Sequence, residues 1–214
     1  MRYNELTFQG RNAVLEAFRS GKTIDKLFIL DGCQDGPIKS IVREAKKTDA
    51  IINYVDKERL DRLAGTGHHQ GVVAIGAAYE YAEVEDILAA AKEKGEDPFI
   101  FILDEIEDPH NLGAIIRTAN LAGAHGVIIP KRRAVGLTAT VAKTSAGAIN
   151  YTPVAKVTNI SQTIEELKKQ GLWFVCADMG GETMYNLNLK GPIGLVIGCL
   201  LYTSPSPRDR TRSR

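Results

Sequence analysis

Residues 99–130, FIFILDEIEDPHNLGAIIRTANLAGAHGVIIP, predict a strand, a loop, a helix and a second strand in that order. Residues 99–103 form a short continuous apolar run, which is typical of a strand buried on both faces. Residues 126–130 have the same character at the other end. A helix between two such strands indicates a parallel, right-handed βαβ unit. The stretch therefore predicts an α/β fold built on a parallel sheet.

The helix of this unit is expected to begin just after Asp108-Pro109, with Asp108 or Asn111 as its N-terminal cap. One face has the i, i+3, i+4, i+7 spacing of a buried apolar stripe, formed by Leu112, Ile115, Ile116 and Ala119. The adjoining flank carries Gly113, Arg117, Asn120 and Ala124.

Arg117 is the chemically distinctive residue of that flank. We expect Gly113, one turn earlier, to leave an open notch beside the guanidinium at the electropositive beginning of the helix. A guanidinium next to free backbone N–H groups suits a phosphate or a ribose oxygen. The alternative is a surface arginine on an ordinary α/β helix, and the spacing by itself favours that alternative.

A chain of 214 residues is long enough for one large domain or two small ones. It has no apolar run of membrane-spanning length and no signal-peptide pattern at its start. Cys33, Cys176 and Cys199 are odd in number and far apart, which argues against a disulfide framework or a zinc site. These features predict a cytoplasmic protein with no membrane partner.

The charge is unevenly distributed along the chain. The formal net charge is +1, but residues 199–214 hold four arginines and one aspartate, which leaves 23 basic and 25 acidic residues in 1–198. The basic balance therefore comes entirely from the last residues. A nucleic-acid partner would have to be bound by local patches, because long-range electrostatic attraction is weak.

Residues 1–78 predict a compact α/β domain. The expected elements are helix 8–20, strand 26–30, helix 38–47, strand 51–55, helix 57–64 and strand 72–77. Arg11 and Asn12 open the first helix, where they either contact phosphates or form a cap and an exposed arginine. The loop with His68-His69 suggests metal only weakly, because adjacent histidines point apart and no other ligand lies nearby. We expect this loop to be flexible, with Gln70 available to a partner.

Residues 79–97 predict an acidic linker and contain the domain boundary. A short amphipathic helix is expected within it, with an apolar face formed by Val84, Ile87, Leu88 and Ala91. Its acidic side is expected to be solvated.

Beyond the βαβ unit, Lys131, Arg132 and Arg133 directly follow a strand. Parallel sheets bind ligands at the carboxyl ends of their strands, so these bases either contact a nucleic-acid backbone or are a solvated charge run. Residues 138–148 are rich in small side chains that suit close helix packing, and Ser145 either packs there or hydrogen-bonds a substrate.

The last part of the chain predicts strand 154–157, helix 160–170, strand 172–177 and strand 192–198. Asp178, Met179, Gly180 and Gly181 follow one of these strands. A glycine pair lets the backbone approach a ligand closely, although the sequence alone favours a tight turn.

Several motifs together resemble the SpoU (TrmH) family of RNA ribose 2′-O-methyltransferases over residues 8–198. They are Asn111-x-Gly113-x-x-x-Arg117-Thr118-Ala119, Gly10-Arg11-Asn12-Ala13-Val14, His69-Gln70-Gly71-Val72 and Lys143-Thr144-Ser145-Ala146-Gly147-Ala148. The resemblance is closest to the bacterial enzymes that methylate a guanosine of 23S rRNA.

The resemblance implies a small, ribosomal-protein-like RNA-binding domain (1–78), the linker (79–97) and a SPOUT-type parallel-sheet methyltransferase domain (98–198). It implies S-adenosylmethionine as cofactor, RNA as substrate and a homodimer. The implied catalytic residues are Arg117 and Asn111. The implied cofactor-binding residues are Asp178, Met179, Gly180, Gly181, Ile197 and Gly198. The implied RNA-binding residues are Arg11, Asn12, Gln70, Lys131, Arg132, Arg133 and Ser145, and no metal is implied.

Residues 199–214 depart from the family pattern. Relatives continue after the strand ending at Gly198 into a Ser-Glu-Gly-type motif, and later a Ser-Leu-Asn motif and a last helix, which together form a trefoil knot. Here the sequence is CLLYTSPSPRDRTRSR, which matches neither motif and has the composition of a disordered, non-native tail. We therefore expect the knot to be missing, the cofactor site to be incomplete and the chain to be inactive.

Two other functions remain as alternatives. A non-catalytic RNA-binding protein is favoured if the missing motifs are absent from the gene. A nucleotide-binding enzyme of Rossmann type is disfavoured, because no strand is followed by G-x-G-x-x-G or a P-loop.

Overall fold

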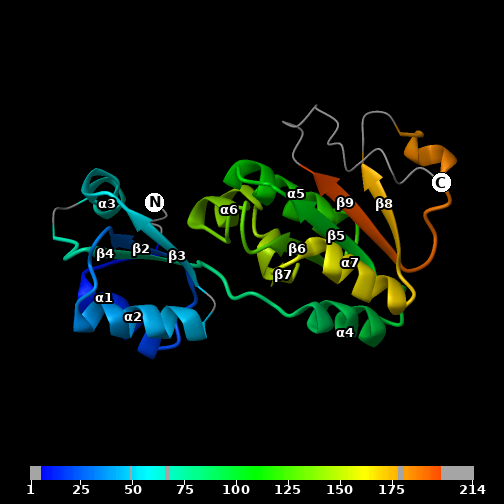
Figure 1. Ribbon diagram of the computed structural model, residues 1–214. Coiled ribbons are helices and arrows are strands. Elements are labelled where there is room, and N and C mark those ends of the chain that lie inside the picture. Colours follow the sequence, from blue (N-terminus) through cyan, green and yellow to red (C-terminus); the bar gives the residue numbers. More distant parts are fainter. Residues whose placement is uncertain (1–5, 49, 66–67, 178–180, 199–214) are drawn as a thin grey trace. The chain divides into compact units, whose positions relative to one another are not determined.

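The computed structural model describes residues 6–48, 50–65, 68–177 and 181–198, which contain two separate β-sheets (Figure 1). The chain divides into two compact units. Unit 1 comprises Met1–Tyr81, Asp108–Arg117 and Val135–Tyr151. Unit 2 comprises Ala82–Glu107, Thr118–Ala134 and Thr152–Arg214. Among the described residues, no helix is both long enough and apolar enough to cross a membrane.

Unit 1 contains a four-stranded sheet in the order β1-β4-β2-β3. Its elements are β1 (Leu6–Gln9), α1 (Arg11–Arg19), β2 (Ile24–Leu30), α2 (Gly36–Lys47), β3 (Ile51–Val55), α3 (Lys57–Ala64) and β4 (Val72–Gly76). Strand β2 pairs in parallel with β3 and antiparallel with β4, which pairs antiparallel with β1. The predicted α/β character of this region is confirmed.

The alternation of side chains along β2 gives this sheet two covered faces. Leu27 and Ile29 lie in one cluster with apolar residues of α1 and α2, including Val14 and Ile41. Phe28, between them, lies in the other cluster with residues of α3. Because successive strand residues point to opposite faces, one strand supplies both cores.

The expected helix 8–20 is wrong at its start. Phe8 belongs to β1, where it pairs with Ala74 of β4, and the helix begins only at Arg11. Gly10 separates the two elements with φ of 84°, a left-handed backbone conformation that glycine adopts readily. The strand is only four residues long, so its pattern is too short to outweigh the helical spacing that follows it.

A buried carboxylate lies within unit 1. The Tyr81 hydroxyl donates to Asp25 Oδ1 at 3.0 Å and accepts a hydrogen bond from the Leu137 backbone N–H at 3.0 Å. Burial, with the charge of Asp25, raises the pKa of the Tyr81 phenol far above its usual value. The phenol therefore stays neutral and holds the backbone near Leu137.

Unit 2 contains a five-stranded sheet in the order β7-β6-β5-β9-β8, and every pairing is parallel. Its strands are β5 (Phe99–Asp104), β6 (Gly126–Pro130), β7 (Val154–Val157), β8 (Trp173–Ala177) and β9 (Ile193–Gly198). The other described elements of this unit are α4 (Val84–Lys94), α7 (Ile160–Lys169) and the 3-10 turn η2 (Met184–Asn186). The predicted parallel sheet is confirmed.

Helix α4 contributes to the core of unit 2. Ile87 is fully buried in one cluster with Ile100 and Ile102 of β5 and Ile128 of β6. The helix begins at Val84, and Asp86 accepts a hydrogen bond from the Glu83 backbone N–H at 2.9 Å. The acidic segment thus contains a helix that is packed against the sheet on its apolar side.

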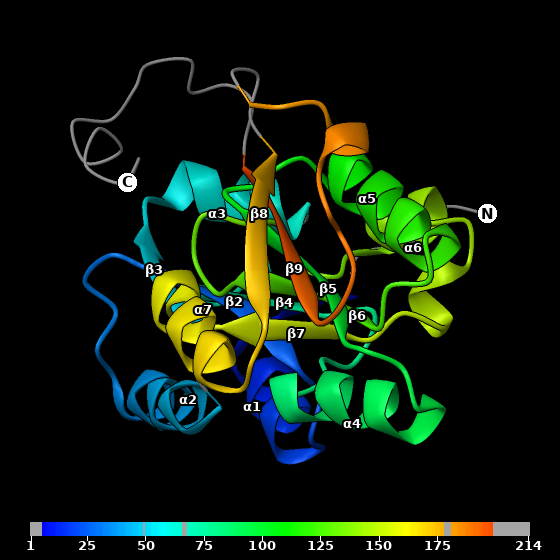
Figure 2. The same cartoon turned by 90° about the vertical axis from the view of Figure 1, so that its right-hand side faces the viewer.

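Helix α5 (Pro109–Leu121) connects β5 to β6, and α6 (Ala139–Thr144) and the 3-10 turn η1 (Ala148–Asn150) lie between β6 and β7. The connection through α5 between adjacent parallel strands is the predicted βαβ unit. Figure 2 shows α5 beside α6.

The notch expected at Gly113 is filled. A Cβ on Gly113 would lie 1.9 Å from Thr144 Oγ1, 2.8 Å from Thr144 Cβ and 3.0 Å from the Ser145 backbone nitrogen. Glycine is therefore required here by the close approach of α6, and the expectation of an open space beside Arg117 is wrong. Sequence spacing locates the glycine on the helix flank but contains no information on what packs there.

Gly113→Ala is expected to destabilise the protein by about 1–3 kcal/mol, because the added methyl group overpacks the α5–α6 contact. Gly36→Ala is the matched control: it lies at the start of α2 with nothing within 4 Å of a new Cβ, and should change stability by less than about 0.5 kcal/mol. The measurement is urea unfolding. Adding Thr144→Ala to Gly113→Ala should restore part of the loss, and equal stabilities of the two single variants would contradict the prediction.

Candidate functional site

The carboxyl edge of the unit 2 sheet brings together the ends of β5, β8 and β9. In the strand register, Gly198 pairs with Asp104, while Ile197 pairs with Leu103 on one side and Ala177 on the other. Open parallel sheets bind ligands outside the carboxyl ends of their strands. Ile197 and Gly198, two residues of the implied cofactor site, therefore lie at the edge where a ligand is expected.

The predicted cofactor loop follows β8. Asp178, Met179 and Gly180 lie outside the described residues, whereas Gly181 is exposed. Among the described residues, nothing lies within 4 Å of the position that a Cβ would take on Gly198. Gly198 is exposed at the end of β9.

A charged pair links the loops that follow β5 and β6. Arg133 Nη1 lies 2.9 Å from Glu105 Oε1, and both residues have positive φ, 56° and 55° respectively. Arg133 is 78% exposed, Arg132 is exposed and Lys131 is half-buried. The sequence left two alternatives for this basic run, contact with a nucleic-acid backbone or a solvated charge run. Arg133 fits neither alternative completely, because its side chain is exposed but already forms an ion pair with Glu105.

Asp104 lies beside this pair at the end of β5. Partial burial is the main cause that raises the pKa of its carboxyl, the negative charge of Glu105 adds to the effect, and Arg133 opposes it. The pair with Arg133 therefore lowers the electrostatic cost of two adjacent carboxylates.

Asp108 caps helix α5. Its carboxylate accepts hydrogen bonds from the backbone N–H groups of His110 at 3.2 Å and Asn111 at 3.3 Å. Asp108 is thus the cap, and the alternative of an Asn111 cap is wrong. The Asn111 residue is exposed in the first turn. The predicted apolar face is confirmed at Leu112, Ile116 and Ala119, which are buried, while Ile115 is half-buried.

Arg117 is exposed and makes no ion pair with any residue that the structure describes. It lies about 12 Å along the helix axis from Pro109, so the expectation that it sits at the helix beginning is wrong. It is about 9 Å along the axis and about 120° around it from Asn111. A ligand that touches both residues therefore spans more than one turn of α5. Asn120, on the same flank, instead donates to Thr152 Oγ1 at 3.0 Å.

Ser145 is fully buried, and its hydroxyl donates to the Ala142 carbonyl at 2.9 Å. This geometry favours the packing alternative. Ser145 directly follows α6, and its backbone nitrogen lies in the close contact with Gly113.

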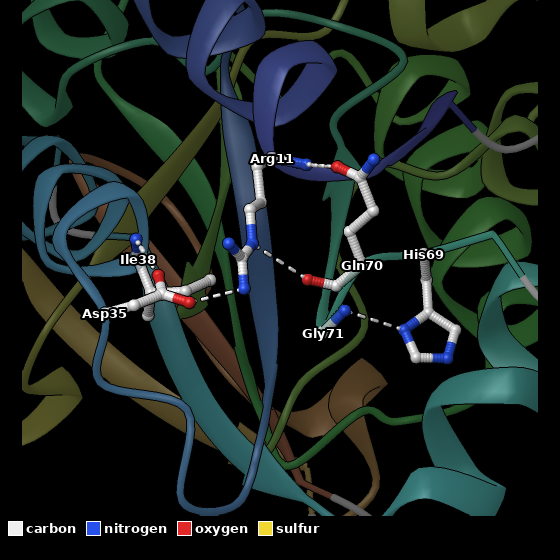
Figure 3. A network of polar contacts seen from close by, with 6 residues as sticks. All are labelled: Arg11, Asp35, Ile38, His69, Gln70 and Gly71. Carbon is white, nitrogen blue, oxygen red and sulfur yellow. Dashed lines mark hydrogen bonds and ion pairs between the residues drawn. The ribbon is translucent and has the colours of Figure 1, made fainter.

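Arg11 and Gln70 hold each other in unit 1 (Figure 3). The Arg11 backbone N–H donates to Gln70 Oε1 at 3.1 Å, and Arg11 Nε donates to the Gln70 carbonyl at 3.2 Å. Arg11 Nη2 also forms an ion pair with Asp35, the N-terminal cap of α2. Gln70 is therefore already bonded to Arg11, while the flexibility expected for this loop stays a prediction.

The adjacent histidines differ in environment. His68 is exposed, whereas His69 is 5% exposed, with Nε2 2.8 Å from Asp61 Oδ1 and Nδ1 accepting from the Gly71 backbone N–H at 3.0 Å. In the described part of the chain, no group of three or more His, Cys, Asp or Glu residues is arranged to hold a metal ion.

Two residues of these clusters were missed from the sequence. Asp35 precedes Gly36-Pro37, a turn signal that also marks the start of a helix. Its role as a helix cap could therefore be predicted from the sequence, but its ion pair with Arg11 could not. The role of Glu105 depends on a positive φ at a residue other than glycine, for which the sequence carries no signal.

Comparison with known proteins identifies the family. Residues 98–199 match the SpoU rRNA Methylase family, and residues 9–82 match the RNA 2′-O ribose methyltransferase substrate binding family. The chain belongs to the SpoU rRNA methylase family. It is thus a TrmH-type RNA 2′-O-methyltransferase by descent.

The SpoU family assignment is supported by close relatives. The chain is 52% identical over 190 residues to the putative TrmH family tRNA/rRNA methyltransferase YacO of Bacillus subtilis, and the match covers 88% of this chain and 76% of that protein. It is 46% identical over 195 residues to a putative TrmH family tRNA/rRNA methyltransferase of Staphylococcus haemolyticus, covering 91% and 78%.

Solved structures share the fold of this SpoU chain. The rRNA methyltransferase from Sinorhizobium meliloti matches with a TM-score of 0.51 at 23% identity, covering 93% of this chain and 73% of that one. The SpoU methyltransferase AviRb from Streptomyces viridochromogenes, solved in complex with AdoMet, matches with a TM-score of 0.53 at 19% identity, covering 98% and 78%.

Asp104→Asn is expected to raise the urea midpoint of unfolding at pH 7, but to have little effect at pH 4 or below. The folded-state pKa of Asp104 is raised, so its ionised form is penalised on folding at neutral pH, and this penalty disappears as the carboxyl becomes protonated. Asparagine is uncharged at both pH values. An equal gain at both would show that charge is not the cause.

Proposed function

We propose that the parent enzyme of this chain, with the family motifs that residues 199–214 lack, methylates the 2′-OH of a guanosine ribose in 23S rRNA, with S-adenosylmethionine as methyl donor. The observation that carries the proposal is the order of the two family matches, with the Asn111–Arg117 motif on the helix that follows the central strand β5. The relatives' names leave tRNA and rRNA open, and the guanosine of 23S rRNA is proposed from the sequence resemblance.

Arg117 is the proposed catalytic residue. A guanidinium is always protonated in proteins, so it is a poor general base. Its exposed position without an acidic partner among the described residues instead suits a phosphate next to the target ribose. The positive charge of Arg117, held beside that phosphate, lowers the effective pKa of the 2′-OH. The phosphate or a water molecule then accepts the hydroxyl proton.

Asn111 is proposed to orient the ribose. Asn111 is exposed and lies about 1.7 helical turns before Arg117, and its amide can both donate hydrogen bonds to hydroxyl groups and accept them. Methyl transfer needs the hydroxyl oxygen in line with the transferred group, so holding the ribose from two points contributes orientation.

The cofactor is proposed to bind at the carboxyl edge of the unit 2 sheet. Ile197 and Gly198 would contact it through the backbone, together with the loop formed by Asp178, Met179, Gly180 and Gly181. The exposure of Gly198 and the adjacency of β5, β8 and β9 support this position. S-adenosylmethionine supplies an electrophilic methyl group on a sulfonium, so no metal is needed.

Two surfaces are proposed to bind RNA. In the region that matches the substrate-binding family, Arg11, Asn12 and Gln70 adjoin the start of α1. In the methylase region, Lys131, Arg132 and Arg133 follow β6. For Ser145 only an indirect role is proposed, through the packing of α6 against Gly113.

The wider organisation is part of the proposal. Residues 1–78 bind RNA, 79–97 connect them to the methyltransferase region 98–198, and two chains form a homodimer in the cytoplasm. The match to the methylase family ends at residue 199, so residues 200–214 lie outside it.

A second candidate function is RNA binding without catalysis. It is favoured by residues 199–214, which contain neither the Ser-Glu-Gly-type motif nor the Ser-Leu-Asn motif that the resemblance implies. We propose that methyl transfer by this chain requires those motifs.

The chain is expected to bind S-adenosylmethionine poorly and to transfer no methyl groups. Replacing residues 199–214 with the corresponding segment of the Bacillus subtilis relative should restore both, measured by calorimetry and by methyl incorporation into 23S rRNA. Tail replacement by a scrambled segment of the same length is the control. Full turnover by the unaltered chain would refute the requirement.

In the active, tail-replaced protein, Arg117→Ala is expected to lower kcat by about 10²–10³, because a group that stabilises developing charge is lost. RNA affinity should fall by no more than about fivefold, the value of about 1 kcal/mol for an exposed ion pair. Arg117→Lys keeps the charge but not the forked geometry and should lie between the two. Equal losses in kcat and RNA affinity would contradict the assigned role.

A further inference from the structure

Helix α2 is the most basic of the described helices. It contains four basic residues and one acidic residue, in a chain whose residues 1–198 carry more acidic than basic groups. We propose that the α2 stripe, defined as Lys39, Arg43 and Lys46, binds the phosphate backbone of the RNA substrate. This inference rests on the proposed function, because it assumes an RNA ligand, but it assigns a surface that the sequence motifs do not contain.

The three stripe residues share one exposed flank of α2. Ile38, Ile41 and Ala45 are buried on the opposite side, in the core of unit 1. At 100° per residue, the stripe residues fall within an arc of about 60° and extend over about 10 Å of the helix axis. All three are exposed. The flank therefore presents a row of positive charge along a rigid helix.

Helix stability does not explain this row. Lys46 lies in the last turn, where a cation is favoured by the helix dipole. Lys39, in contrast, lies in the first turns and Arg43 in the middle, where the dipole gives no such advantage. The fourth basic residue, Lys47, pairs with Glu44 at 2.9 Å. Among the described residues, none of the stripe residues has an ion-pair partner.

The N-terminal end of α2 adjoins the start of α1, where RNA is already proposed to bind. Asp35 caps α2 and pairs with Arg11 at the start of α1 (Figure 3), and the Lys39 backbone N–H donates to the Asp35 carbonyl at 3.0 Å. The two helices also pack against each other. An RNA strand at Arg11 and Asn12 can therefore continue along α2. Because overall attraction is weak, such a local row is the kind of contact that the charge distribution requires.

The test compares the chain with the triple variant Lys39→Gln, Arg43→Gln, Lys46→Gln in filter binding to 23S rRNA over a range of salt concentrations. Each phosphate contact contributes about 0.7–0.9 to the slope of log affinity against log salt, so the variant's slope should fall by about 2. Affinity at low salt should fall by about tenfold or more. The matched control, Lys92→Gln, Lys94→Gln, Lys169→Gln, removes three exposed charges outside unit 1 and should keep the original slope.

Equal slopes for the stripe variant and the control would overturn the proposal. The single variant Arg43→Gln, expected to lower the slope by about 0.7–0.9, gives the same decision if the triple variant does not fold. The double variant Lys39→Arg, Lys46→Arg keeps both positive charges and should therefore keep the original salt slope. If the unaltered chain does not bind 23S rRNA, both this inference and the rRNA proposal fail. If the unaltered chain binds 23S rRNA but the stripe variant keeps the original salt slope, as the control does, only the assignment of the α2 stripe fails.

Discussion

Burial of β5 on both sides is the constraint on which unit 2 depends. The strand pairs in parallel with β6 and with β9, and its residues Ile100, Ile102 and Leu103 are completely enclosed. A parallel pair cannot be joined by a tight turn, so each neighbour requires a crossover, and α5 is one of these. The strand ends of β5 and β9 are thereby brought to one edge, and Asp108 begins α5 only four residues after β5 ends. The chemistry proposed for the family follows from this arrangement, because the motif helix starts where the sheet stops.

Much of this fold was predictable, for a definite reason. The strands of unit 2 are continuous apolar runs and α5 has a clear helical period, so the order of elements followed from local patterns. The failures are of another kind. At the start of the chain, a four-residue strand before Gly10 was mistaken for the first turn of a helix, since too few residues define its period. At Gly113, the sequence indicated a missing side chain but not that Thr144 occupies the space.

The candidate site was predicted less completely than the fold. The motif identified Arg117 as a distinctive residue, and the structure leaves it exposed, but its distance from the helix start and its separation from Asn111 depend on three-dimensional geometry. Pairings such as Arg11 with Asp35 and Arg133 with Glu105 join residues 24 and 28 positions apart. No local pattern connects such residues. The charges on α2 were present in the sequence, but they form a row only once the buried side of the helix is known.

The mutual contacts of Arg11 and Gln70 also bear on the RNA contact proposed at the start of α1. Immobilising a flexible side chain during association costs about 0.5–1.5 kcal/mol, and ordering a loop costs more. In the free protein, the two hydrogen bonds between these residues and the ion pair to Asp35 have already met much of this cost. The surface at the start of α1 is therefore preorganised, so encounters with a ligand need no slow rearrangement there. The free energy of binding at this surface would then depend more on the contacts formed with the ligand than on the conformational entropy lost by the side chains.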